Sequence, residues 1–420
     1  MARRTHVRIP LGPRVNRKLP PVGDEFVSVE ALASLGLLAV TILALGWANS
    51  PWRDAYADLW HTDLTVGTAT FGITEDLRHW INDGLMAIFF FVVGLEIKRE
   101  IVCGDLRDPR RATAPVLAAL GGMVVPAAIY LAINVGTGGG EGWGVPIATD
   151  IAFALGLLAL LGRRLPSGLR LLLLTLAIVD DVGAIIVIAI FYTSAVSLPW
   201  LGAAVATVGG IVLMGRLGAR SPFAYVAPGV LLWVCTFEAG IHATIAGVVL
   251  GLLAPARPFR GRPVIDQVEQ ALHPWTSFVI VPVFALANAG VALSGDALGD
   301  ATSSRVTWGI VVGLVGGKLL GVFGALVLST RLGIGTLPDD VRLADTVAVA
   351  ALAGIGFTVS LFIADLSFAG GPLLAEAKVG ILVASIVSAA VGCALLLWRG
   401  RVRAPASEDA SKGAAEGAAR

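Results

Sequence analysis

Residues 171–192 read LLLLTLAIVDDVGAIIVIAIFY, an apolar run with two adjacent carboxylates, Asp180 and Asp181, near its middle. A helix needs about 20 apolar residues to cross the hydrocarbon core of a membrane, so this run is long enough to span it. One ionisable side chain at mid-depth costs at least roughly 2.5–3.5 kcal/mol on insertion scales. We therefore expect a membrane helix whose aspartates have a function. Our hypothesis is that they bind a cation and protons in alternation.

The whole chain has the composition of a polytopic helical membrane protein. Of its 420 residues, 56% are hydrophobic and 15% are charged, and the mean hydropathy is +0.82. The apolar residues form long runs rather than alternating patterns, which favours an all-α polytopic fold over a β-barrel. The net charge of +1 and the lack of a basic patch with aromatics give no indication of nucleic-acid binding. The three cysteines lie far apart and indicate neither a disulfide framework nor a metal site, and we expect no cofactor.

The hydropathy pattern predicts twelve membrane spans. They are expected near residues 27–47, 83–102, 112–134, 143–161, 169–192, 198–215, 222–236, 240–254, 275–293, 306–329, 343–365 and 377–398. This twelve-span domain would cover 26–398, after a basic N-terminal extension over 1–25 and before a disordered tail over 399–420. The polar residues 61–83 alternate Thr, Val and Gly, which predicts a surface hairpin or an amphipathic segment.

Loop charges predict the orientation of the spans. Lysine and arginine gather in the N-terminal extension and in every second loop after it, whereas the intervening loops hold mainly aspartate and glutamate. Positively charged loops stay in the cytoplasm, so both termini are expected there and the segment 61–83 is expected outside.

The fourth and eleventh spans are interrupted by glycine and proline. The fourth reads GWGVPIATDIAFALG over 142–156, and the eleventh reads AALAGIGFTVSLF over 350–362. In helix interiors, glycine and proline cost about 1 and 3 kcal/mol relative to alanine. Two such interruptions at comparable places in the two halves predict a pair of broken helices. The alternative is that these residues serve only close helix packing.

Charged side chains deep in the spans are the candidates for a transport site. Asp150, Asp180, Asp181 and Lys318 all fall well inside apolar runs. Adjacent helical residues point about 100° apart, so one of Asp180 and Asp181 can face a ligand while the other lines the wall. Thr149 and Asp150 would supply a hydroxyl and a carboxylate beside free helix ends. Lys318 would offset the carbonyl ends of the other broken helix or pair with one of the two aspartates. The alternative is that these acids only form ion pairs with buried cations. The spans hold three deep acids but only one deep cation, so such pairing could not neutralise all of the acids.

A second group of charges lies at the cytoplasmic ends of spans two and nine, and it consists of Glu96, Arg99, Glu100, Glu269 and His273. Glu96 and Arg99 are three residues apart, so a local ion pair is one interpretation. The other is a cytoplasmic funnel that attracts cations and senses pH. His273 precedes Pro274 and could instead end a surface helix. His242 is flanked by apolar residues and is expected to be a packed histidine rather than a sensor.

Seven stretches of the chain resemble the NhaA-type sodium/proton antiporters of bacterial inner membranes. They are NDGLMAIFFFVVGLEIKREI (82–101), PIATDIAFALG (146–156), LAIVDDVGAIIVIAIFY (176–192), GIHATIAG (240–247), LHPWTSFVIVPVFALANAG (272–290), GGKLLG (316–321) and LAGIGFTVSLFIADLSF (352–368). They follow in family order within residues 25–398. The resemblance implies twelve spans, with spans 3–5 and 10–12 forming an inverted repeat and spans 4 and 11 broken and crossing.

The resemblance also implies roles for individual residues. Asp180 and Asp181 would form the cation and proton site, with Asp181 the more central ligand, and Thr149 and Asp150 would lie at the helix crossing. Lys318 would balance the crossing and exchange protons with Asp180. The residues Glu96, Arg99, Glu100 and Glu269 would form a cytoplasmic pH-sensing cluster. Gln270 stands where a second histidine is expected, which leaves the pH set-point open.

The implied activity is transport and not enzymatic catalysis. Two protons would be exchanged for one Na⁺ or Li⁺ across the bilayer, driven by the membrane potential, and a homodimer would form through a periplasmic hairpin such as 61–83. Three other classes stay open at this point. An intramembrane aspartyl hydrolase would need a second converging aspartate, for which Asp150 is the candidate. A passive channel would show a repeated filter or charge rings, and a transporter-derived sensor would carry no flux.

Overall fold

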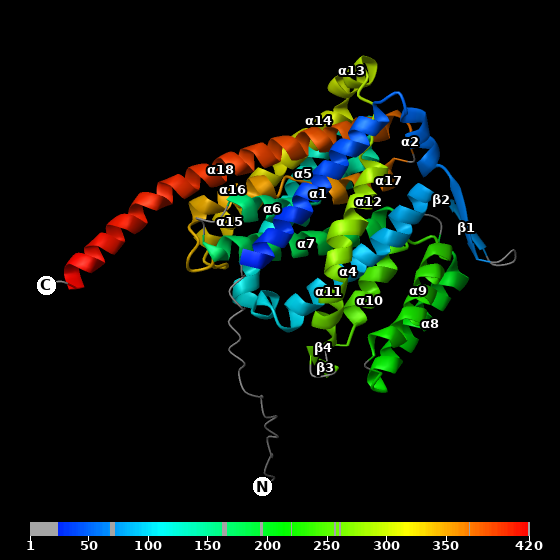
Figure 1. The fold of residues 1–420 in the computed structure, drawn as a ribbon, viewed down its shortest axis with the longest axis horizontal. Helices are drawn as coiled ribbons and strands as arrows, with labels where there is room; N and C mark the ends of the chain where they lie inside the picture. Colours follow the sequence, from blue (N-terminus) through cyan, green and yellow to red (C-terminus); the bar gives the residue numbers. More distant parts are fainter. Residues whose placement is uncertain are drawn as a thin grey trace, which may run out of the picture.

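The computed structural model of the chain describes residues 24–67, 72–161, 166–193, 196–219, 221–255, 258–259, 262–368 and 370–418. Within these ranges the protein is almost entirely helical (Figure 1). The longer helices are α1 (Asp24–Ala48), α4 (Met86–Val102), α5 (Pro109–Asn134), α6 (Ile151–Leu161), α7 (Ser167–Phe191), α8 (Leu198–Arg216), α9 (Val226–Glu238), α10 (Thr244–Leu253), α11 (Val264–Trp275), α15 (Lys318–Arg331), α17 (Phe357–Ser367) and α18 (Pro372–Ala418).

Short helical segments and two hairpins connect these helices. The shorter helices are α2 (Arg53–Trp60), α3 (Leu77–His79), α12 (Val281–Asn288), α13 (Gly295–Ser303), α14 (Arg305–Val311) and α16 (Thr346–Leu352). The π-helical turns are η1 (Trp80–Leu85), η6 (Thr276–Ile280) and η7 (Val312–Gly317), and the 3₁₀ turns include η3 (Gly140–Ile147). The hairpins pair β1 (Asp63–Gly67) with β2 (Gly72–Asp76) and β3 (Pro258–Phe259) with β4 (Arg262–Pro263).

The structure is that of an α-helical, multi-pass membrane protein. Eight helical segments in the described ranges are long and apolar enough to cross a membrane, and one bent pair of helices raises the number to nine. Two shorter apolar helical stretches, Pro222–Glu238 and Thr244–Leu253, fall below that length. The count of twelve spans therefore stays a prediction, as does the pairing of spans 4 and 11 as the crossing helices.

The segment between the first two spans forms the hairpin β1–β2, one of the two forms predicted for residues 61–83. Most of the basic N-terminal extension and the hairpin tip, residues 1–23 and 68–71, lie outside the described residues. After Trp398 the chain differs from the prediction, because helix α18 continues to Ala418 where we expected a disordered tail over 399–420 (Figure 1). Alanine, glutamate and lysine are strong helix formers, which favours this continuation.

The helices pack as two groups. In the large bundle, α5 packs on α15 and α7, α18 packs on α14 and α16, and α17 packs on η3. In the small bundle, α4 packs on α10 and α11, and α9 packs on α8 and α10. Helix α12 continues α11 through the turn η6 and belongs with the small bundle. Helix α1 contacts both groups, through α6 and through α12, and Figure 1 shows it crossing the molecule between them.

Two close helix contacts depend on glycine. A Cβ atom on Gly321 of α15 would lie 2.1 Å from the backbone oxygen of Gly121 on α5. The reciprocal Cβ on Gly121 would lie 2.4 Å from the oxygen of Gly321. Small residues let membrane helices approach backbone to backbone, so these glycines set the distance at which Lys318, one turn before Gly321, is held.

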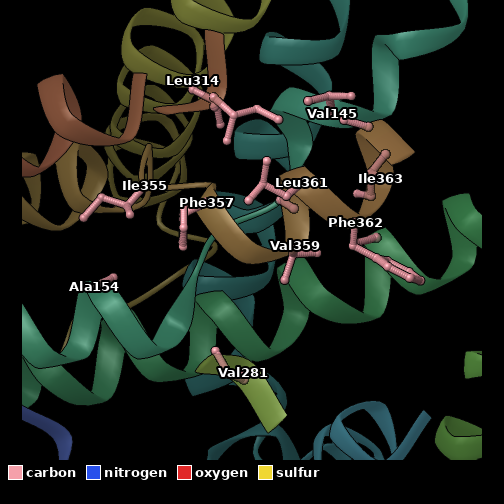
Figure 2. Packing of buried hydrophobic residues seen from close by; sticks show 14 of the residues in the cluster. Val145, Ala154, Val281, Leu314, Ile355, Phe357, Val359, Leu361, Phe362 and Ile363 are labelled. Carbon is pink, nitrogen blue, oxygen red and sulfur yellow. The ribbon is translucent and has the colours of Figure 1, made fainter. Parts of the chain in front are cut away.

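The main apolar cluster encloses the helix α17. Phe357, Leu361 and Phe362 are almost completely buried in it. Figure 2 shows the side chains of α17 in the middle of this cluster, with Val145 of η3, Leu314 of η7 and Val281 of α12 around them. Helix α17 is therefore held by apolar packing from both bundles.

Candidate functional site

The interruptions of the fourth and eleventh predicted spans meet in space. Between η3 and α6 the residues Ala148–Asp150 are not helical, and between α16 and α17 the chain bends by 48°. The backbone N–H of Asp150 donates to the carbonyl oxygen of Ile355 at 2.6 Å. The Thr149 hydroxyl donates to the carbonyl oxygen of Ala353 at 2.8 Å. Each break thus satisfies backbone groups that the other break leaves without helical partners.

Asp150 joins the two helices that follow the breaks. Its Oδ2 accepts from both the backbone N–H and the hydroxyl of Thr358, at 3.0 and 2.6 Å. Its Oδ1 accepts from the backbone N–H of Phe153 at 3.1 Å. A carboxylate at a helix N-terminus interacts favourably with the helix dipole. Here one carboxylate bonds to the first turns of both α6 and α17, so its main geometric role is to hold these two helices together.

Lys318 pairs with the first aspartate of the pair, which is one of the two roles considered from the sequence. Its ammonium group is fully buried and donates to Oδ2 of Asp180 at 2.5 Å. It also donates to the hydroxyl of Thr149 at 3.0 Å. Lys318 follows directly after the π-helical turn η7. A third element therefore brings its ammonium group to the place where the two interruptions meet. A buried charge needs such partners, because leaving it unpaired costs several kcal/mol.

Asp181 is buried beside Asp180 on α7, but its carboxylate has quite different surroundings from that of Asp180. It is 1% exposed, and neither of its carboxylate oxygens has a hydrogen-bond partner among the described residues. The Oδ1 atom of Asp180 is likewise buried without such a partner. Buried polar groups are nearly always hydrogen-bonded, so three such oxygens on two consecutive residues are unusual. Oxygen atoms without a hydrogen-bond partner are the kind that take up a proton or a hard cation.

The group of charges predicted to face the cytoplasm is joined by tertiary contacts rather than along one helix. Arg99 on α4 forms an ion pair with Glu269 on α11 and not with Glu96. His273 lies 3.4 Å from Oε1 of Glu30 on α1. Helix α11 also continues through Pro274 to Trp275, so His273 does not end it. The group therefore ties three helices together.

The other two predicted residues of this group lie beside that network. Glu96 is partly buried on α4, and Glu100 is buried where α4 turns at Gly104. A Cβ atom on Gly104 would lie 2.7 Å from the Cα atom of Glu100, so the close turn favours glycine there.

An additional charged group lies at the opposite end of α4. Nε2 of His79 is 3.0 Å from Oδ2 of Asp83, and Nδ1 of His242 is 3.4 Å from Oδ1 of the same carboxylate. His242 is thus packed, as expected, with its ring against Phe362. The hydrogen bond with Asp83 raises the pKa of His79 to about 9 against the opposing effect of burial, and the charges of Asp83, Glu75 and Asp76 add to the rise.

The sequence did not predict several of the hydrogen-bond and ion-pair partners of these residues. Thr358 was inside the quoted stretch GFTVS, but nothing in the pattern indicated that it would bond to Asp150. Glu30 is a lone acid inside the first apolar run, and its position there does not indicate that it lies beside His273. Within the described ranges, no group of three or more His, Cys, Asp or Glu side chains is arranged to hold a resident metal ion.

Comparisons with known proteins agree with the motifs. A family model described as Na⁺/H⁺ antiporter 1 matches residues 24–396. The chain is 45% identical to the Na⁺/H⁺ antiporter NhaA 2 of Sorangium cellulosum, over 89% of this chain and 88% of that protein. It is 44% identical to the NhaA of Rhodopirellula baltica, over 94% and 97% of the two chains. It is 47% identical to the NhaA of an Acidovorax species, over 88% and 90%.

Proposed function

Because the chain belongs to the NhaA family of Na⁺/H⁺ antiporters, we propose that it exports cytoplasmic Na⁺ in exchange for external H⁺ across the bacterial inner membrane. The observation that supports this best is the Asp181 carboxylate, which is buried and whose two oxygens have no hydrogen-bond partner among the residues that the structure describes. A carboxylate in that state is stable with a proton or with a bound cation, and much less stable with neither.

The chemistry of exchange follows from competition for the same oxygens. Na⁺ is a hard cation and takes oxygen ligands, and the unpartnered oxygens of Asp181 and Oδ1 of Asp180 supply three. Two neighbouring carboxylates in a low-dielectric place disfavour the doubly ionised state, so protons bind when Na⁺ leaves. Asp181 carries one proton, and the Asp180–Lys318 pair supplies the other. Exposing this site to either face in turn is sufficient for antiport.

The finer features of transport are proposed on the same basis. Exchange of two protons for one Na⁺ or Li⁺ moves one net charge, so the membrane potential contributes about 2.3 kcal/mol per 100 mV. The network of Arg99, Glu269 and His273, with Glu96 and Glu100 beside it, would sense cytoplasmic pH, since changes in its charge alter how α1, α4 and α11 hold together. The exposed hairpin β1–β2 would join two copies as a homodimer.

The site geometry speaks against the hydrolase alternative. An aspartyl hydrolase needs two carboxylates that share a proton. Asp150 bonds to Thr358 and Phe153 instead, and in the described structure Asp181 shares no hydrogen bond with another carboxylate. Antiport uses such an isolated carboxylate, whereas this hydrolytic mechanism does not.

The test is proton movement in acid-loaded everted membrane vesicles when Na⁺, Li⁺ or K⁺ is added between pH 6.5 and 9. We expect Na⁺ to alkalinise the vesicle interior with the wild-type protein and not with Asp181→Asn or Asp180→Asn. The absence of a response to Na⁺ across this pH range, with expression verified, would contradict the proposed function. A full response in Asp181→Asn would place the site elsewhere.

A stability measurement separates a lost site from a lost fold in these variants. Asp180→Asn leaves the buried Lys318 without its anionic partner, which should lower the free energy of unfolding by about 3–5 kcal/mol. Asp181→Asn removes a carboxylate that has no hydrogen-bond partner in the described part of the chain, so the melting temperature of this variant should equal or exceed that of the wild type. Asp181→Asn is therefore the informative variant for function.

A further inference from the structure

Alternating access in such transporters is largely a movement of one helix bundle against another around a fixed site. The large bundle of this protein contains α17, whose first turn bonds to Asp150 through Thr358. The small bundle contains α4, α10 and α12, and the turn η1 leads directly into α4. Contacts that join the two bundles at one end must therefore break when the site opens to that end.

One directional contact joins the bundles at the end of α4 that carries His79 and Asp83. The side-chain amide of Asn82, in η1, donates to Oδ2 of Asp365 on α17 at 2.7 Å. Asn82 is 6% exposed and Asp365 is half-buried. Asp365 lies seven residues after Thr358 on one unbroken helix, about 10 Å along its axis. It therefore moves with the site.

The partner of Asp365 is anchored in the small bundle. The amide of Asn288 on α12 donates to Oδ1 of Asn82 at 2.8 Å. Trp233 of α9 donates to the backbone oxygen of Asp83 at 2.9 Å, and Asp83 lies beside His79 and His242. The turn η1 is thus fixed to α9, to the segment before α10 and to α12, and Asn82 extends from it to the other bundle.

The neighbouring contacts between the bundles are mainly contacts between rings. Phe362, one turn before Asp365 on α17, packs its ring against Phe90, Phe284 and His242. Figure 2 shows Phe362 at the edge of the packed side chains of α17. Apolar contacts are not directional, so they permit sliding. A hydrogen bond to a carboxylate has a fixed geometry and breaks when the partners separate.

We propose that the Asp365–Asn82 hydrogen bond is an external latch, which holds the outer end of the transport path closed and must open for exchange with the outside. This inference rests on the proposed antiport. The latch makes Asp365 a positioning residue, because it touches neither Asp180 nor Asp181 and acts by setting how often the outward-open state forms.

The first test compares two cross-links that share Asn82. Cys103, Cys235 and Cys393 are replaced by serine, and a short bifunctional methanethiosulfonate then joins Asn82→Cys with Asp365→Cys, or Asn82→Cys with Asn288→Cys. Only the first link spans the two bundles. We expect it to abolish Na⁺-driven proton movement until a reductant is added, whereas the second link leaves exchange intact.

Three results would contradict the latch. Exchange that persists under a complete Asn82→Cys/Asp365→Cys link would show that this contact need not open. Equal loss with the Asn82→Cys/Asn288→Cys link would show that separation of the bundles is not what the first link blocks. If the wild-type protein gave no Na⁺ response, the proposed function would fail and the latch with it, and this outcome is separate from the other two.

The second test needs no cross-link. Opening the latch raises the fraction of molecules that can bind Na⁺ from outside, so in oriented proteoliposomes Asp365→Ala should lower the KM for external Na⁺ about tenfold. The KM for cytoplasmic Na⁺ should not fall. The matched control is Glu376→Ala, since Glu376 bonds to Ser304 within the large bundle, and both its KM values should match the wild type. A KM unchanged on both sides in Asp365→Ala, or raised on both, would overturn the proposal.

Discussion

Asp150 and Asp181 carry the same functional group in opposite surroundings. The oxygens of Asp150 accept three hydrogen bonds from Thr358 and Phe153, whereas those of Asp181 accept none among the described residues. Each charge-assisted bond contributes about 1.5–3 kcal/mol, so a carboxylate with three of them does not exchange ligands easily. Asp150 is therefore a fixed link between α6 and α17. Under the proposed function, Asp181 is the group that binds and releases ions.

His79 makes the stability of the contact with Asp83, at the start of α4, depend on pH. Its pKa is about 9 in the folded protein against 6.5 ordinarily, because of its bond to Asp83. The resulting stabilisation is fully present below pH 6.5 and is lost as pH rises through 9. His79 is half exposed, which limits the effect to about 1 kcal/mol. We expect His79→Gln to melt below the wild type at pH 6 and together with it above pH 9, measured in detergent.

The control for this prediction is His79→Lys, which keeps a positive charge beside Asp83 throughout the range. The difference in melting temperature between His79→Lys and His79→Gln should persist at pH 9. Identical pH dependence of melting in the wild type and in both variants would show that the Asp83 contact contributes no proton-linked stability.

Single residues divide clearly into those that the sequence could predict and those that it could not. A carboxylate in an apolar run is rare, so Asp150, Asp180 and Asp181 could be found directly, and the structure buries all three. Their partners could not be found. Glu96 was the visible candidate for Arg99 because it lies one helical turn away, whereas the actual partner Glu269 comes from another helix.

At the scale of elements, the breaks were readable and their junction was not. Glycine and proline marked both interruptions, but which backbone groups would bond across them depends on how the two segments pack. The π-helical turns η1, η6 and η7 were also invisible, since hydropathy has no signal for a single extra residue in a turn. Such turns often occur at functional sites, and here η7 ends directly before Lys318.

The contact between α5 and α15 gives a prediction at this scale. Gly321→Ala would place a Cβ atom 2.1 Å from the oxygen of Gly121 and should lower the free energy of unfolding by about 1–3 kcal/mol, as overpacking does. Because Lys318 lies one turn away, Na⁺-driven exchange should fall as well. The measurements are the melting temperature in detergent and exchange in everted vesicles.

Gly324→Ala on the same helix is the matched control. A Cβ atom there meets nothing within 4 Å, and replacing glycine by alanine in a helix is favourable by about 0.5–1 kcal/mol. It should therefore keep or raise stability and leave exchange unchanged. Equal behaviour of the two variants would mean that the backbone contact between α5 and α15 does not hold Lys318 in place.

At the scale of the whole molecule, the two ends of α4 carry different networks. One end holds Arg99 and Glu269, and the other leads to Asn82 and Asp83. Loop charges assign the first end to the cytoplasm, and the direction of transport, the pH-sensing role and the external latch all depend on that assignment. The assignment is a prediction from sequence alone, because the charge bias is a property of loops and needs no tertiary contact.

The native Cys103 tests this orientation. It is exposed at the end of α4 nearest Arg99, so with Cys235 and Cys393 replaced by serine an impermeant maleimide should label it in everted vesicles and at least about tenfold less in right-side-out ones. Thr65→Cys with Cys103→Ser marks the hairpin β1–β2 and should show the reverse pattern. If Cys103 were labelled from outside, the Arg99–Glu269 network would face the exterior. The contact between Asn82 and Asp365 would then close the cytoplasmic end, and exchange driven by external protons would have to begin at the opposite end of α4.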